Sequence, residues 1–141
     1  MARDNEVTVE LRCEPAIIYG VPRLIDELVY NLTSNAIRYN RPQGSVVVSC
    51  GIAGENRPFI RVADTGIGIA KDEQAKVFER FYRVDKSRSK ARGGTGLGLA
   101  IVKHAALFHE ATIDLDSTLG EGTTITVTFP AQEWTIEAYI A

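Results

Sequence analysis

Two asparagines, Asn31 and Asn35, are the first residues whose type and spacing suggest chemistry. On a helix they are neighbours one turn apart, and they share a polar stripe with Glu27 and Arg38 along the edge of an apolar face. Asparagine is a poor helix former, so two of them on a half-buried edge need a reason. Amide oxygens are hard ligands suited to Mg²⁺, and Arg38 could reach a phosphate. The alternative is a capped, solvated helix edge.

The carboxylate of Asp64 ends a predicted strand on the side of the core, as strand parity indicates. A bare carboxylate is costly there, so it needs a donor such as the exocyclic amine of a base or a water molecule. The hydroxyl of Thr123 points toward the same face and could reinforce this site. Gly66 and Gly68 let the backbone turn and approach a ligand closely. A strand-ending Asp-Thr-Gly turn is the plainer interpretation.

Two further segments suggest phosphate binding. Residues 93–98 form a glycine-rich loop that leads into a predicted helix, whose free N–H groups and positive end favour an anion. The loop has neither the Walker A nor the dinucleotide-binding spacing, and a flexible linker is the alternative. In residues 78–86 aromatic residues alternate with basic ones, so rings could anchor a lid while Arg83 and Lys86 face a phosphate. A solvated basic loop pinned by three rings is the other interpretation.

Composition limits the class of protein. The chain has 141 residues, 45% of them hydrophobic and 24% charged, which is typical of one globular domain. The net charge of −2 argues against a general nucleic-acid binder. Residues 76–92 nevertheless carry +5 and the rest of the chain −7, which suggests a local anionic ligand. No apolar run is long enough for a membrane helix, and no signal-peptide pattern opens the chain.

The cysteines and histidines do not indicate a metal site. Cys13 and Cys50 form neither a CxxC nor a zinc pattern, which fits a reducing cytoplasm. We interpret them as buried or half-buried thiols without function. His104 and His109 fall on different faces of a predicted helix, so they do not pair as metal ligands. We interpret both as structural or surface residues.

The elements that must position these residues follow from hydrophobic periodicity. Strands are predicted over 7–11, 16–18, 45–52, 59–63, 111–115 and 124–129, and helices over 22–40, 72–81 and 97–108. Their order predicts an α+β fold, a two-layer α/β sandwich in which helices cover one face of a mixed, mostly antiparallel sheet. Residues 64–95 are otherwise irregular, which is typical of a functional lid or a disordered segment. The tail, 131–141, is ambiguous, and a short packed helix is preferred there.

The order and spacing of these motifs resemble the catalytic, ATP-binding domain of bacterial sensor histidine kinases, in the ATPase superfamily shared with gyrase, Hsp90 and MutL. The resemblance runs from about residue 20 to 130. Residues 31–39 resemble the N box, 64–68 the G1 box, 78–83 the F box and 94–98 the G2 box. The Phe-Glu-Arg-Phe-Tyr-Arg sequence of the F box separates the kinase branch from the others. The resemblance implies a single domain over 1–141, with a Bergerat-type ATP-binding fold and a lid over about 70–96.

The resemblance also implies a role for each matching position. Asn35, supported by Asn31, would hold Mg²⁺, and Asn35 and Arg83 would be the catalytic residues. Asp64 would accept a hydrogen bond from the adenine amine of ATP, with support from Thr123. The positions around the nucleotide would be Arg38, Arg83 and Lys86 at the phosphates, Tyr39 and Ile69 at the nucleoside, Gly66 and Gly68 in the G1 box, and Gly94, Thr95, Gly96, Leu97, Gly98 and Leu99 in a lid over the triphosphate.

This sequence departs from the family pattern in two ways. Arg38 stands where the N box usually has lysine, which keeps the charge but changes the geometry. No phosphoacceptor box is present, and neither histidine has such a context. In the family the γ-phosphoryl group passes to a histidine on a helical dimerisation domain, and then to an aspartate of a response regulator. The implied partners are therefore a dimerisation domain N-terminal to this chain and a response regulator reached through it.

The resemblance thus predicts a monomeric, cytoplasmic domain that binds ATP and Mg²⁺ and contacts neither nucleic acid nor membrane. The full-length protein could be anchored in the inner membrane by a segment before the dimerisation domain. Two alternatives stay open: a nucleotide-sensing interaction module that transfers no phosphate, and an anti-sigma-type serine kinase, which the F box disfavours. The lid is expected to be mobile without nucleotide.

Overall fold

The computed structural model of the chain describes residues 6–79 and 97–131. Within these ranges the chain forms a five-stranded sheet with two α-helices. The strands are β1 (Thr8–Cys13), β2 (Ser45–Ala53), β3 (Arg57–Asp64), β4 (Thr112–Thr118) and β5 (Gly122–Thr128), and the helices are α2 (Pro22–Arg38) and α4 (Gly98–Phe108). A short 3₁₀ turn, Gly54–Asn56, joins β2 to β3.

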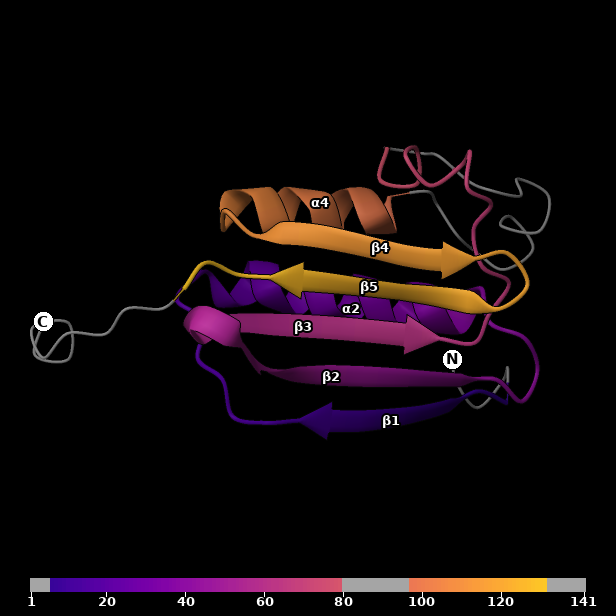
Figure 1. Cartoon of the computed structure of the whole chain (residues 1–141), viewed down its shortest axis with the longest axis horizontal. Helices are drawn as coiled ribbons and strands as arrows, with labels where there is room; N and C mark the ends of the chain where they lie inside the picture. The colour runs from indigo at the N-terminus through magenta and orange to yellow at the C-terminus, as the bar shows by residue number, and fades with distance from the viewer. Residues whose placement is uncertain (1–5, 80–96, 132–141) are drawn as a thin grey trace, which may run out of the picture.

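The sheet has the strand order β1-β2-β3-β5-β4. Strands β1 and β2 are parallel, and the other three neighbouring pairs are antiparallel. Figure 1 shows α2 behind the sheet and α4 beside β4, so the two helices form a second layer. The predicted α+β sandwich, with a mixed and mostly antiparallel sheet, is confirmed.

The core lies between the sheet and the helices. Alternate residues of the central strands are buried because successive side chains of a strand point to opposite faces. The apolar stripe of α2 covers them, as its periodicity predicts, and α4 closes the layer on the side of β4. The buried members of this core include Val46, Val48, Ile60, Val62, Ile125 and Val127 from the sheet, Leu28, Leu32 and Ala36 from α2, and Val102, Ala105 and Ala106 from α4.

Strand register brings three polar side chains into one row at one end of this buried face. Asp64 on β3 pairs with Thr123 on β5, and Thr123 pairs with Ser117 on β4. All three are half-buried and lie on the side of the sheet that the helices cover. The parity argument for Asp64 and Thr123 is therefore confirmed, and the sheet itself positions both groups.

Two predicted elements are wrong within the described residues. Residues 16–18 form no strand, and the outer edge of β1 has no neighbouring strand among the described residues. Residues 72–78 form successive turns instead of the start of a helix. Their backbone bonds span three residues, as in Lys76 N to the carbonyl oxygen of Glu73 at 3.0 Å. The remainder of the predicted helix and the tail after residue 131 lie outside the described residues.

His109 joins the two helices, which confirms its structural interpretation. Its Nε2 accepts a hydrogen bond of 3.0 Å from the backbone N–H of Val21, the N-cap of α2. Its Nδ1 lies 2.8 Å from the carbonyl oxygen of Ala105, to which it donates because Nε2 is the acceptor. The ring also meets Phe129 edge-on, with centroids 5.9 Å apart. His104 is exposed, as a surface residue should be.

In the parts of the chain that the structure describes, neither helix is long and apolar enough to cross a membrane. The same residues contain no cluster of three or more His, Cys, Asp or Glu side chains that could hold a metal ion.

Candidate nucleotide-binding site

Asp64 is held in one orientation by two backbone donors. Its Oδ1 accepts a hydrogen bond of 2.8 Å from the N–H of Gly66 and one of 3.2 Å from the N–H of Thr123. Burial raises the pKa of this carboxyl group above its ordinary value, although both N–H groups act in the opposite direction. Both bonds use Oδ1, which leaves Oδ2 available to a donor from outside the described residues. The carboxyl is thus a rigid acceptor that gains from such a partner.

Ser117 completes the polar row and was not predicted. Its Oγ accepts a hydrogen bond of 2.8 Å from the N–H of Ile69 and donates one of 2.9 Å to the carbonyl oxygen of Gly122. It also lies 2.8 Å from Oγ1 of Thr123. Because the single hydroxyl proton of Ser117 goes to Gly122, Thr123 must donate in this last pair. The Thr123 oxygen, on the register partner of Asp64, then keeps its lone pairs as a second acceptor.

The glycines of the segment 64–68 permit close packing of the backbone. A Cβ on Gly66 would lie 2.4 Å from the carbonyl oxygen of Tyr39, and one on Gly68 would lie 2.1 Å from that of Thr118. Gly68 also has a positive φ of 71°, which side chains disfavour. The expectation was a close approach to a ligand, but the approach that the structure shows is to the protein's own chain. The segment 64–68 is therefore closely packed between the end of α2 and the β4–β5 turn.

Arg41 holds the same segment from the other side and was also missed. Its Nε donates to the carbonyl oxygen of Thr65 at 2.7 Å, and its Nη2 donates to those of Gly66 at 3.1 Å and Gly120 at 2.6 Å. The neighbouring Asn40 is buried and donates to the carbonyl oxygen of Ser45 at 2.9 Å. The sequence around Arg41 predicts only a turn, because bonds to distant carbonyl groups leave no local pattern.

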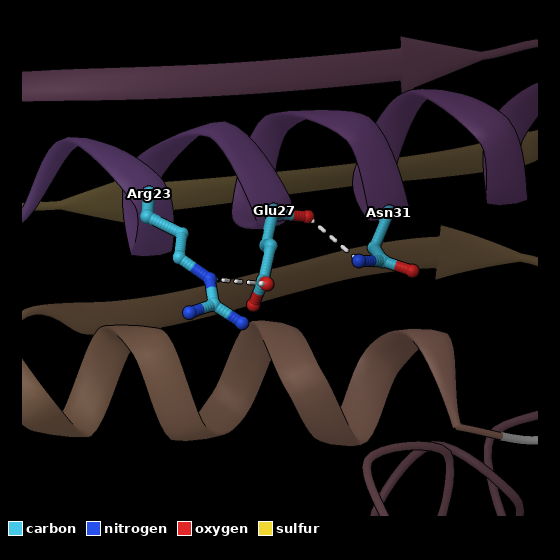
Figure 2. A network of polar contacts seen from close by, with 3 residues as sticks. All are labelled: Arg23, Glu27 and Asn31. Atoms are coloured by element: carbon cyan, nitrogen blue, oxygen red, sulfur yellow. Dashed lines mark hydrogen bonds and ion pairs between the residues drawn. The ribbon is translucent and has the colours of Figure 1, made fainter.

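The polar stripe of α2 faces α4. Figure 2 shows Arg23, Glu27 and Asn31 on successive turns, pointing toward α4. Arg23 pairs with the Glu27 carboxylate at 3.5 Å, and Nδ2 of Asn31 donates to the backbone carbonyl of Glu27 at 2.7 Å. That bond fixes the amide and leaves Oδ1 of Asn31 as the free oxygen. Asn35 is half-buried one turn further on.

The N-terminus of α4 lies next to Asn31. A Cβ on Gly98, the first residue of the helix, would be 3.3 Å from Oδ1 of Asn31. Among the described residues no side chain caps this end, and no acidic residue stands in the first turn of the helix. The first N–H groups of α4 therefore have no partner within the helix and favour an anion. The N–H groups of this helix end could bind a phosphate, and the nearby amide oxygen of Asn31 could bind the cation that accompanies it.

The structure thus groups the predicted residues into two clusters. Asp64, Gly66, Gly68, Ile69 and Thr123 meet at the end of the sheet, together with the backbone of Tyr39. Asn31, Gly98 and the neighbouring Leu97 meet at the start of α4. Arg38 is the last residue of α2 and is half-buried, and Leu99 packs against the core. Arg83, Lys86, Gly94, Thr95 and Gly96 lie outside the described residues.

The first part of the predicted lid is fixed to the body. Nε2 of Gln74 donates to the carbonyl oxygens of Ile69 at 3.0 Å and Ser117 at 3.1 Å. Val77 is buried, and Phe78 packs against the core. These contacts hold the segment from Gln74 to Phe78 against the body of the domain. The expected mobility of the rest of the lid concerns residues outside the described ranges.

The comparison with known families identifies this arrangement. Residues 20–133 match the family of histidine kinase-, DNA gyrase B- and HSP90-like ATPases. The chain therefore belongs to this ATPase family. Within it, the chain is the catalytic ATPase domain of a sensor histidine kinase, similar to the sensor-like histidine kinase SenX3.

Individual proteins support this assignment. SenX3 of Mycobacterium tuberculosis is 50% identical over 143 residues, which cover 99% of this chain and 33% of SenX3. The mycobacterial sensor histidine kinase MprB superposes with a TM-score of 0.81 at 30% identity, over 94% of this chain and 90% of that one. A full-length ShkA structure in complex with AMPPNP gives a TM-score of 0.76 at 25% identity, over 92% of this chain and 26% of that one. This chain spans about a third of SenX3.

Proposed function

We propose that this domain binds Mg·ATP and donates the γ-phosphoryl group to a histidine on a dimerisation domain outside this chain. A response regulator would receive the group from that histidine. The supporting observation is the pair of acceptors at the end of the sheet, Asp64 Oδ2 and Thr123 Oγ1, which have fixed positions. Two acceptors at this position would favour a base that presents hydrogen-bond donors there, as adenine does.

The adenine preference follows from donor and acceptor chemistry. The exocyclic amine of adenine has two N–H groups, which match the acceptors of Asp64 and Thr123. Guanine carries a carbonyl oxygen at the corresponding position, so an acceptor would face an acceptor. Such a mismatch leaves a buried polar group without a partner, which is costly. Tyr39 and Ile69 would lie against the nucleoside.

The phosphate end is proposed at the start of α4. Its uncapped N–H groups would bind phosphate oxygens, together with Arg38 and, on sequence alone, Arg83, Lys86 and the glycines of 94–98. The oxygens of Asn31 and Asn35 fit the hard ligands of Mg²⁺, which would neutralise charge on the triphosphate. Catalysis would then rest on positioning the phosphates and balancing their charge, with Asn35 and Arg83 as the catalytic residues.

Isothermal titration calorimetry with ATP and GTP, with and without Mg²⁺, tests the binding part of this proposal. We expect binding that needs Mg²⁺ and that is at least tenfold weaker for GTP. Asn35→Ala should lose the Mg²⁺-dependent binding, whereas Asp26→Ala, an exposed change on the same helix, should not. Equal affinity for ATP and GTP would refute the adenine assignment, and unchanged binding by Asn35→Ala would refute the metal assignment.

Phosphoryl transfer needs a separate assay. The domain, ATP and the dimerisation domain of the same protein should together give acid-labile, base-stable phosphohistidine. Tight ATP binding without this product would favour the nucleotide-sensing module instead. Phosphoserine on a protein substrate would favour the serine kinase. The binding and transfer steps of the proposal therefore fail in distinguishable ways.

A further inference from the structure

Two cysteines that the ATP site does not use lie side by side across the parallel strand pair. Cys13 ends β1, and its register partner on β2 is Cys50. Neighbouring strands of a sheet are about 4.8 Å apart, within the range of roughly 4.4–6.8 Å between the Cα atoms of a disulfide. Register partners also point to the same face of the sheet. The backbone of β1 and β2 therefore already has the spacing that a disulfide needs.

The side chains are also close to one another, because the Cys13 thiol contributes to the raised pKa of Cys50. Cys50 Sγ lies 3.7 Å from the carbonyl oxygen of Glu14, to which it donates. The N–H of Glu14 donates in turn to the carbonyl oxygen of Cys50 at 2.9 Å, which holds the end of β1 against β2. Both cysteines are free thiols. Oxidation of this pair to a disulfide would remove two hydrogens and join the two sulfurs.

The two thiols differ in environment. Cys13 is exposed, contrary to the expectation of two buried or half-buried thiols, because β1 is an edge strand whose residues are all exposed. Cys50 is half-buried and packs against the core. Burial, with the nearby Cys13 thiol, raises the pKa of Cys50 to about 11, so it stays protonated at neutral pH. An oxidant from solvent therefore meets Cys13 first, and Cys50 is placed to react second.

We infer that Cys13 and Cys50 form an oxidisable pair that closes to an intramolecular disulfide when a hydroperoxide reacts with Cys13. The Cys13 thiolate attacks one peroxide oxygen, so that an S–O bond forms, the O–O bond breaks, and water or an alcohol leaves. Cys50 then loses its proton and attacks the sulfur of the Cys13 sulfenic acid, which releases a second molecule of water. The two sulfurs lose two electrons, which reduce the hydroperoxide. Such reversible disulfides are the kind that reducing compartments allow.

The disulfide would tie the edge strand to the core without touching the nucleotide. On β2 the partner of Asp64 is Val46, four residues from Cys50 and so about 13 Å away along the strand. A bridge at Cys50 closes a loop that includes the whole of α2. Cross-linking a loop of this size restricts the unfolded chain, so the oxidised domain should melt roughly 5–15 °C higher. Its ATP affinity should stay within twofold.

Mass spectrometry of the wild-type chain tests the proposal directly. The chain is treated with hydrogen peroxide, the remaining thiols are alkylated, and it is digested with trypsin without reductant. The expected product joins peptides 13–23 and 39–61 and separates again with dithiothreitol. Two unlinked cysteines, or a disulfide between two chains, would overturn the inference. This measurement needs no variant to fold.

Single substitutions test the order of the two steps. In Cys50→Ser, a sulfenic acid trap such as dimedone should label Cys13, since no second thiol can resolve it. In Cys13→Ser, the same peroxide dose should leave Cys50 as a thiol. Strong labelling of Cys50 in that variant would contradict the proposed order. Because nucleotide binding is measured separately, failure of this inference and failure of the proposed function remain distinguishable.

Discussion

At the scale of single residues, the proposed adenine contact depends on the carboxyl group of Asp64. Burial in the fold makes the ionised form of this group less favourable. Asp64 is half-buried, and burial raises its pKa even though two N–H groups stabilise its charge. The ionised form is therefore less favourable in the folded than in the unfolded protein. A ligand that donates a hydrogen bond would relieve part of this cost. The buried carboxylate of Asp64 thus lowers the stability of the unliganded fold, whereas binding of a donor group requires it.

Asp64→Asn should therefore weaken ATP selectivity and stabilise the unliganded fold at neutral pH. Because the folded pKa is raised, the wild-type domain loses stability as the pH rises from about 3.8 through the folded pKa, and Asn has no such titration. The advantage of the variant should therefore be largest near pH 7 and shrink as the pH falls toward 3.8. Urea denaturation at several pH values measures this.

The matched control is Asp114→Asn, the same change at an exposed position of β4. It should alter neither the pH dependence nor the preference for ATP over GTP. If Asp64→Asn is less stable than wild type at pH 7, the cost of burying the charge is smaller than proposed. If its selectivity is unchanged, Asp64 does not contact the base.

Backbone strain gives a second prediction at this scale. Gly68→Ala should lower the free energy of unfolding by about 2 kcal/mol or more, because its φ is positive and the new Cβ would meet the carbonyl oxygen of Thr118. Gly54→Ala is the control, since a Cβ there would have no neighbour within 4 Å. Thermal melts of the two variants should differ clearly, and equal melting temperatures would show that the segment 64–68 can relax.

At the scale of elements, the site is the meeting point of three structures that are distant in sequence. Arg41, just after α2, donates to carbonyl oxygens in the segment after β3 and in the β4–β5 turn. Ser117 on β4 likewise accepts from Ile69. These bonds decide where Asp64 and Thr123 lie relative to one another. The elements therefore cannot shift independently without disturbing the proposed adenine end of the site.

Arg41→Met removes the charged donors but keeps an unbranched side chain as long as the aliphatic part of arginine. Three carbonyl oxygens lose their partner, so we expect a loss of stability of about 1–3 kcal/mol and a several-fold weaker affinity for ATP. Arg57→Met is the control, because Arg57 pairs only with the exposed Glu55 among the described side chains. Calorimetry and urea denaturation measure both effects. Unchanged ATP affinity in Arg41→Met would mean that the segment 64–68 holds its position without this arginine.

Periodicity predicts most of the elements because it reports burial. The apolar face of α2, the hairpin of β2 and β3, and the positions of Asp64 and Thr123 all follow from spacing along the chain. Residues 71–78 form turns although their composition favours a helix, and the Gln74 side chain there bonds to Ile69 and Ser117. Arg41 and Ser117 were missed because their partners are backbone groups far away in sequence. Local patterns carry no record of such contacts.

At the scale of the whole molecule, a single core serves the sheet and both helices. Phe129, just after β5, is 1% exposed, and its N–H donates to the carbonyl oxygen of Pro58 at 2.8 Å. Its ring meets His109, which in turn bonds to the start of α2. The end of the molecule away from Asp64 is therefore closed by contacts among β3, β5 and the two helices.

Phe129→Ala should lower the free energy of unfolding by about 3–5 kcal/mol, because it leaves a cavity in this core. Phe108→Ala makes the same chemical change at a side chain that is 60% exposed, and it should cost far less. Urea denaturation of both variants provides the comparison. Similar losses would mean that the core can collapse around the missing Phe129 ring.

The order of strands in the sheet also has a consequence for biosynthesis. Strand β3, which carries Asp64, is completed on its second edge by β5, the last strand of the described chain. During translation an N-terminal portion can begin to fold first, but β3 keeps an open edge until β5 has been made. Thr123 must then arrive before Asp64 gains its second donor. A nascent chain on the ribosome therefore cannot assemble the proposed adenine end of this site until nearly the whole domain has been synthesised.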